Sequence, residues 1–164
     1  MTPLVSEISA QPGQVIPQAK KISGIILAFD FGIKRIGVAV GNTISNTTRP
    51  LVTLHGEQTE QRFAAIALQI KEWEPAALVV GLPCNDDGTP HEMTRLCRRF
   101  ANRIKGRFNL PVFLVDERYT SATASAQLNE MGVRGIRQKS VLDQVAAQHI
   151  LKAYFDEPTM AHPA

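Results

Sequence analysis

GIILAFDFGIKRIGVAV, residues 24–40, contains two apolar runs that are separated by a short turn with two basic residues. The first run, residues 24–31, is apolar at nearly every position, which is typical of a strand that is buried on both faces of a sheet. The run also contains Asp30, although removing an isolated carboxylate from water costs several kcal/mol. We therefore expect Asp30 to have a charged partner, a bound cation or a catalytic role.

The rest of the chain predicts a meander followed by alternating helices and strands. Further strands are expected over residues 35–41 and 49–54, and the short turns between them favour antiparallel pairing. Helices are expected over residues 59–74, 89–108, 120–132 and 140–157, and strands over residues 76–83 and 111–118. The order β-β-β-α-β-α-β-α-α predicts an α/β fold with a mixed five-stranded sheet and helices on both faces.

Capping residues set the expected beginnings of two helices. Thr89 fits as an N-cap, with Pro90 at the first helical position. Ser140 fits as the N-cap of the final helix, so that Asp143 would lie in its first turn. The segment before that helix, residues 133–139, is then expected to be a basic loop.

The composition is typical of a soluble globular protein: 44% of the 164 residues are hydrophobic, 20% are charged, and the net charge is +3. This charge is compatible with an anionic partner but does not identify one. No apolar run reaches the roughly 18–20 residues that a membrane span needs, so no membrane partner is expected. The two cysteines, Cys84 and Cys97, lack CxxC spacing, which favours a reducing compartment, and we expect a cytoplasmic protein.

The chain is expected to form one folded domain over residues 23–156. Residues 1–22 contain three prolines and no continuous apolar core, and they resemble neither a secretory signal nor a transit peptide. We expect them to be a mobile extension. Residues 157–164 are expected to form a short C-terminal tail.

Asp30, Glu117 and Asp143 are the candidate site acids. Asp30 and Glu117 lie near the carboxyl ends of predicted parallel strands, where ligand sites form in such sheets. Each acid also has a simpler interpretation: Asp30 could cap a turn, Glu117 could pair with Arg118, and Asp143 could belong to a capping box. The sequence leaves open whether Asp116 or Glu117 faces the site.

Three acids at one edge of a sheet would repel one another, and a divalent cation removes that repulsion. Mg²⁺ prefers carboxylate and water oxygens and commonly binds together with substrate phosphates. Either one or two ions could serve, and a pair can activate water and stabilise the leaving oxygen of a phosphodiester. The acids are therefore compatible with phosphodiester hydrolysis that depends on Mg²⁺ or Mn²⁺, a chemistry that needs few other residues.

Four motifs follow one another along the chain: DFGIKRIGVAV, VVGLPCNDDGT, VDERYTSATA and VLDQVAAQHIL. In these motifs the chain resembles the bacterial YqgF family, also called RuvX, whose members are labelled Holliday junction resolvases. The resemblance covers residues 25–155. The chain departs from the family pattern at Asp86, where an apolar residue is more usual, and in its longer N-terminal extension.

The resemblance implies a ribonuclease H-like fold and a metal-dependent nuclease that processes the 5′ end of precursor 16S rRNA. It places the catalytic, metal-binding acids of the family on Asp30, Glu117 and Asp143. The nucleic-acid partner would be structured RNA, alone or in ribosomal precursor particles, with branched DNA as the alternative. A monomer and a weak homodimer are both compatible with the sequence, and symmetric cleavage of a DNA junction would require the dimer.

Basic residues near these acids are candidates for contacts to backbone phosphates, with a solvated turn or an ion pair as the simpler interpretation. They are Lys34, Arg35, Arg118, Arg134, Arg137 and Lys139. A second basic stripe on the helix expected over residues 89–108 is more typical of a solvent-exposed face. It consists of Arg95, Arg98, Arg99 and Arg103.

Two other functions are compatible with the sequence. An Asp on a strand followed by a glycine also resembles the first phosphate loop of actin-like ATPases, but the chain lacks a glycine-rich loop with a following Lys and is too short for two lobes. A non-catalytic module that binds nucleic acid or the ribosome would explain the positive charge equally well. Metal-dependent cleavage of a nucleic acid distinguishes an enzyme from such a module.

Overall fold

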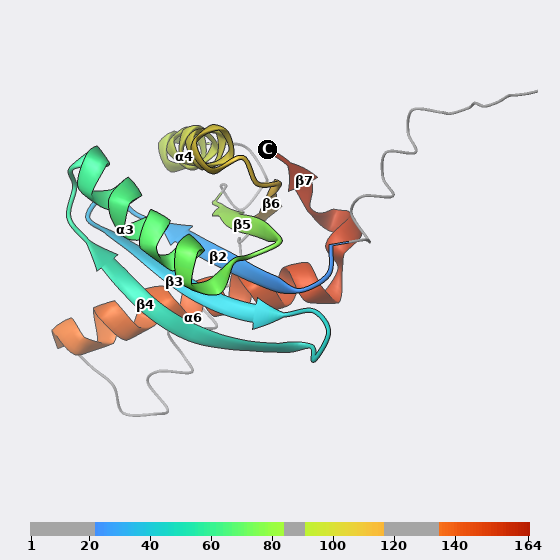
Figure 1. Cartoon of the computed structure of the whole chain (residues 1–164). Coiled ribbons are helices and arrows are strands. Elements are labelled where there is room, and N and C mark those ends of the chain that lie inside the picture. Colours follow the sequence, from blue (N-terminus) through green and yellow to red (C-terminus); the bar gives the residue numbers. More distant parts are fainter. Residues whose placement is uncertain (1–21, 84–90, 117–134) are drawn as a thin grey trace, which may run out of the picture.

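The computed structural model describes residues 22–83, 91–116 and 135–164. In these residues a six-stranded sheet, in the order β4-β3-β2-β5-β6-β7, separates two helical layers (Figure 1). The predicted mixed α/β fold with helices on both faces is therefore confirmed. The helix expected over residues 120–132 and most of the expected extension, residues 1–21, lie outside the described residues.

The strands form a meander joined to a parallel unit. β2 (Ile25–Phe31), β3 (Arg35–Asn42) and β4 (Thr47–His55) pair antiparallel, as predicted. β5 (Ala77–Leu82) pairs parallel with β2, and β6 (Val112–Asp116) pairs parallel with β5. The carboxyl ends of β2, β5 and β6 therefore meet at one edge of the sheet.

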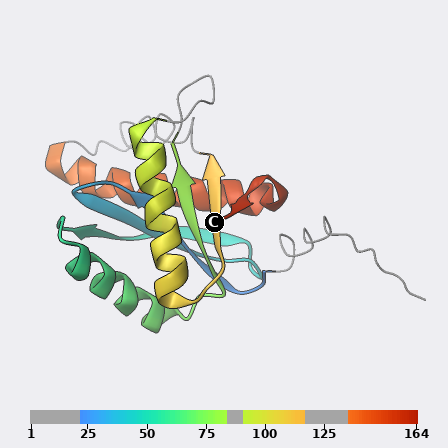
Figure 2. The same cartoon turned by 90° about the horizontal axis from the view of Figure 1, so that it is seen from above.

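Two helices cover one face of the sheet, and one long helix covers the other. α3 (Thr59–Trp73) and α4 (Glu92–Phe108) lie on the first face, opposite α6 (Gly135–Asp156) (Figure 1). Seen from above, α6 crosses behind the strands (Figure 2), and it contacts β2 to β6. Among the described residues, we find no helix with the length and apolar character needed to cross a membrane.

The side chains of β2 alternate between the two faces of the sheet. Leu27 and Phe29 are fully buried in the core beneath α3 and α4, whereas Ile26 and Ala28 are fully buried in the core beneath α6. The same alternation places Asp30 on the α6 face and Phe31 on the opposite face. The carboxyl end of β2 therefore contributes Asp30 to one face of the sheet and Phe31 to the other.

α4 begins later than the sequence predicts. Its N-cap is His91, whose Nδ1 accepts a hydrogen bond from the Met93 N–H at 3.2 Å, while the His91 N–H donates to Thr94 Oγ1 at 2.9 Å. The prediction that Thr89 is the N-cap was therefore wrong. An imidazole nitrogen satisfies a free N–H of the first turn as a hydroxyl oxygen would.

α6 begins earlier than predicted, at Gly135, so residues 135–139 are helical and Ser140 is not an N-cap. Asp143 consequently lies beyond the first turn of the helix. Thr53 Oγ1 donates to the Ser140 carbonyl at 2.7 Å, and Gln144 Nε2 donates to Thr53 Oγ1 at 3.1 Å. These contacts with β4 hold the early part of the helix in place, since tertiary packing outweighs the weak helix propensity of glycine.

The C-terminal residues 157–164 add a sixth strand to the five that were predicted. A 3₁₀ helix, η2 (Pro158–Met160), precedes β7 (His162–Pro163), which pairs antiparallel with β6. The Ala164 N–H donates to the Val112 carbonyl at 2.8 Å. A strand of two residues that includes a proline gives no strand signal in the sequence, because proline is unfavourable in a strand except at a sheet edge.

Candidate active site

Asp30 and Asp143 come together where α6 crosses β3. Asp30 pairs with Gly37 across the β2–β3 ladder. A Cβ atom at Gly37 would lie 1.9 Å from the Asp143 carbonyl oxygen and 2.9 Å from the Asp143 Cβ. Only a glycine at this position lets the helix backbone approach the strand so closely. The missing side chain at residue 37 thus brings the two acids to the same place.

Arg35 supplies a positive charge at this site. It is the first residue of β3, and its Nε donates to Asp143 Oδ2 at 2.6 Å. The two side chains are partly buried, with 34% of Arg35 and 18% of Asp143 exposed. Arg35 therefore compensates Asp143 directly, and its charge also favours the ionised form of Asp30.

The environment of Asp30 disfavours its ionised form. The pKa of Asp30 is raised to about 7, chiefly by burial and also by the negative charge of Asp143, while the charge of Arg35 opposes both effects. Close to neutral pH, the Asp30 carboxyl group is therefore divided between its protonated and ionised forms. The positive charge of Arg35 is not enough to balance two ionised carboxylates at this site.

An open cavity of about 380 Å³ includes both acids. Its wall also includes the turn between β2 and β3, where Lys34 is exposed. The lining residues are Asp30, Phe31, Gly32, Ile33, Lys34, Arg35, Met93 and Asp143. Carboxylate oxygens in such a cavity can bind a divalent cation or hold a water molecule beside a substrate phosphate.

The third predicted acid, Glu117, lies outside the described residues, and so does Arg118. The residue before them, Asp116, is exposed at the end of β6 and pairs with Leu82 of β5. Because β6 runs in the same direction as β2, the chain leaves it at the edge of the sheet where Asp30 lies. The role of Glu117, and the choice between it and Asp116, remain predictions.

No cluster of three His, Cys, Asp or Glu that could hold a metal occurs within residues 22–83, 91–116 and 135–164.

The predicted phosphate-binding residues have different positions. Lys34 and Arg35 lie at the cavity, as expected. Arg137 and Lys139 belong to α6, so the prediction that they lie in a basic loop was wrong. Arg134 lies outside the described residues.

Two structurally important residues at this site were missed by the sequence analysis. Gly37 could have been found, because a glycine inside an otherwise apolar strand indicates close approach of another backbone. Arg62 of α3 donates through Nη1 to the Ile33 carbonyl at 3.0 Å and through Nη2 to the Gly32 carbonyl, which holds the turn at the cavity in place. An arginine on a helix gives no sequence signal for such a role.

Proteins of a known family are similar to this sequence over most of its length. A family model described as "RuvX: Holliday junction resolvase" matches residues 24–157. A protein from Methylobacillus flagellatus is 59% identical over 133 residues, which cover 81% of this chain and 91% of the relative. A protein from Chromobacterium violaceum is 59% identical over 136 residues, covering 82% and 99%. Both relatives carry the name "Putative pre-16S rRNA nuclease".

Solved structures share the fold at much lower sequence identity. The Thermus thermophilus RuvC structure in complex with a Holliday junction substrate has a TM-score of 0.51 and 17% identity, covering 86% of this chain and 99% of that chain. The fowlpox virus resolvase in complex with Holliday junction DNA has a TM-score of 0.51 and 15% identity, covering 80% and 97%. These neighbours confirm the ribonuclease H-like fold. The family match and the close relatives show that this chain belongs to the RuvX family.

Proposed function

We propose that this protein is an endonuclease that uses a divalent cation to hydrolyse phosphodiester bonds at the 5′ end of precursor 16S rRNA. The observation that carries the proposal is the meeting of Asp30 and Asp143 in an open cavity at one edge of a ribonuclease H-like sheet. The names of the close relatives support the substrate. The protein would act in the cytoplasm, on the RNA alone or within ribosomal precursor particles.

The donor chemistry of the site fits Mg²⁺ or Mn²⁺. Asp30 and Asp143 offer carboxylate oxygens, which these ions prefer. Burial and the negative charge of Asp143 raise the pKa of Asp30, and a cation beside the two acids would favour its ionised form, which supports the proposal. We propose Glu117 as a third ligand because it follows β6 at the same edge of the sheet. The bound ion would activate the attacking water and stabilise the charge that develops on the phosphate.

The other residues of the cavity position the acids and the substrate. Arg35 fixes the Asp143 carboxylate through Oδ2. Lys34 and Arg35 bring positive charge to the rim, where a backbone phosphate would bind next to the acids. Further phosphate contacts are proposed for Arg118, Arg134, Arg137 and Lys139.

The test is cleavage of a 16S precursor RNA with an extended 5′ end, in Mg²⁺ or Mn²⁺, by the full-length protein. The wild type should shorten the 5′ end, whereas Asp30→Asn and Asp143→Asn should lose cleavage and retain RNA binding. Asp156→Asn is the matched control, because Asp156 is exposed at the end of α6. Unchanged cleavage by Asp30→Asn would point to a contaminating nuclease. Binding without cleavage by the wild type would favour the non-catalytic module.

Branched DNA is the second candidate substrate. The description of the family as a Holliday junction resolvase favours it, and the fold is shared with two resolvases that were solved with junction DNA. Symmetric cleavage of a junction would require two copies of the chain. Cleavage of a four-way DNA junction is measured in the same assay as cleavage of the RNA, and the substrate with the higher kcat/KM value is the preferred one. The oligomeric state is measured in parallel.

A further inference from the structure

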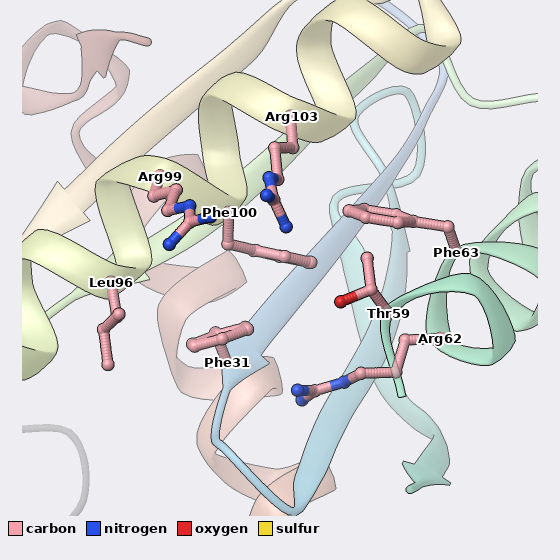
Figure 3. A pocket seen from close by; sticks show the side chains of 8 residues that line it. All are labelled: Phe31, Thr59, Arg62, Phe63, Leu96, Arg99, Phe100 and Arg103. Carbon is pink, nitrogen blue, oxygen red and sulfur yellow. The ribbon is translucent and has the colours of Figure 1, made fainter. Parts of the chain in front are cut away.

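A second cavity lies on the opposite face of the sheet from the acids, between α3, α4 and the end of β2 (Figure 3). Its volume is about 240 Å³. Aromatic rings line it together with three arginines, and we call it the arginine pocket. These residues are Phe31, Phe63, Phe100, Arg62, Arg99 and Arg103.

The aromatic rings of the arginine pocket are packed against one another. Phe31 and Phe100 stack with their centroids 4.7 Å apart, and Phe63 and Phe100 stack at 6.4 Å. The Arg62 guanidinium lies 4.9 Å from the Phe31 centroid and covers that ring. Because these ring faces are already in contact with protein groups, the pocket favours a sugar over a stacked base.

Two of the arginines have no ion-pair partner among the described residues. On the same helix, Arg95 pairs with Glu92 at 2.5 Å and Arg107 lies 3.3 Å from a Glu60 oxygen. Arg99 and Arg103 are exposed one turn apart, and neither forms an ion pair with any part of the chain that the structure describes. A guanidinium group can bind phosphate oxygens through two parallel N–H donors, so unpaired arginines beside a cavity can bind a phosphate.

Arg62 adds a third positive charge across the pocket. Figure 3 shows its guanidinium on the other side of the Phe31 ring from Arg99 and Arg103. Its Nη atoms are held by the turn carbonyls, whereas its Nε is buried without a hydrogen-bond partner among the described residues. Burial lowers the pKa of Arg62, and the negative charge of Glu57 opposes this effect. Arg99 and Arg103 form no ion pair with the described residues, so positive charge remains at the cavity to attract an anion.

The arginine pocket adjoins the candidate active site at the end of β2. Phe31 lines both cavities, and its neighbour Asp30 faces the other side of the sheet. Arg62 is bound to the turn that forms part of the active-site wall. A nucleic-acid strand that crosses the end of β2 would therefore meet the acids on one side and the arginines on the other.

We propose that the arginine pocket binds a backbone phosphate of the substrate, away from the bond that is cleaved, and so positions the strand across the acids. Arg99 and Arg103 bind this phosphate, and the aromatic residues contact its sugar. The inference rests on the proposed nuclease function, because it assigns the pocket to the same substrate.

The test measures binding of a fluorescent single-stranded RNA from the 16S precursor to the full-length protein, without divalent ions, at salt concentrations between about 50 and 200 mM. The pocket variant is Arg99→Gln combined with Arg103→Gln. The matched control is Arg95→Gln combined with Arg98→Gln, which removes the same charge from exposed positions of α4 outside the pocket. The pocket variant should bind about tenfold more weakly at low salt, and its salt slope should fall by about 0.7.

Equal affinities and equal salt slopes for the pocket and control variants would overturn the proposal. A mononucleotide competitor tests whether the pocket instead binds the phosphate and sugar of a free nucleotide. If it binds the wild type and not the pocket variant, while the RNA salt slopes are equal, the pocket serves a free nucleotide and the proposal is wrong. Because binding is measured without cleavage, failure of the nuclease function would appear separately, as a wild type that does not cut RNA.

Discussion

Gly37 and Asp143 form a contact between strand and helix backbones that leaves no space for a side chain at residue 37. A Cβ atom there would lie 1.9 Å from the Asp143 carbonyl oxygen. Gly37 is also the ladder partner of Asp30, so the same contact determines how the two acids face each other. The geometry of the site depends on a residue that takes no part in its chemistry.

Gly37→Ala should destabilise the protein by about 1–3 kcal/mol or more, because the added methyl group forces α6 away from β3. The same displacement should separate Asp143 from Asp30 and reduce cleavage. Urea denaturation gives the change in the free energy of unfolding, and the RNA assay gives the change in activity.

Gly106→Ala is the control for this substitution. Gly106 is exposed within α4, and a Cβ atom there would meet nothing within 4 Å. Alanine should therefore stabilise the helix by about 0.5–1 kcal/mol and leave cleavage unchanged. A Gly37→Ala protein as stable as the wild type would show that α6 does not pack on β3 as described.

The strands and their order could be predicted because their signals are local. Continuous apolar runs such as residues 24–31 indicate burial on both faces, and short turns indicate antiparallel pairing. The sequence placed Asp143 near Asp30 because it assigned Asp143 to the first turn of a helix packed on the sheet, and the family resemblance pointed the same way. The two acids do line one cavity, although the helix begins at Gly135 and Asp143 lies beyond its first turn.

The remaining features arise from contacts between distant segments. β7 forms only because the C-terminal residues lie along β6, and α6 extends to Gly135 while it packs on β3 and β4. Arg99 and Arg103 were correctly predicted to be exposed. The pocket that they border depends on the packing of α3 against α4 and Phe31, which the sequence of a single helix cannot reveal.

Arg35→Gln should lower the stability of the metal-free protein by about 1–2 kcal/mol, because it leaves two partly buried acids without their cation. It should also raise the pKa of Asp30 further, since Arg35 is the group that lowers it. Lys34→Gln is the control, because Lys34 is exposed in the turn. Chemical denaturation of both variants checks this, and equal stability losses would contradict the role given to Arg35.

Mg²⁺ or Mn²⁺ should raise the melting temperature of the wild type and leave that of Asp30→Asn and Asp143→Asn nearly unchanged. An ion at 100 times its Kd stabilises the folded state by about 2.7 kcal/mol, which corresponds to about 5–10 °C for a chain of this size. Removing the ion with a chelator should abolish cleavage. Equal metal-induced increases in the wild type and in both variants would place the ion elsewhere.

Asp30 should make the metal-free protein less stable as the pH rises. The pKa of this carboxyl group increases from 3.8 to about 7 on folding. Between these values the folded state binds more protons than the unfolded state, so stability is highest near the lower pH and is lost as the pH rises through about 7. Asp30→Asn removes this dependence, and the variant should exceed the wild type in stability by up to a few kcal/mol above pH 7.

Urea denaturation in the presence of a chelator, at a series of pH values from about 4 to 8, measures this difference. The stability curves of the wild type and Asp30→Asn should converge at the acidic end and separate toward the alkaline end. Asp156→Asn, at an exposed position, should stay parallel to the wild type throughout. If Asp30→Asn also stays parallel, Asp30 ionises as easily in the folded protein as in the unfolded chain. Burial beside Asp143 would then not govern its charge.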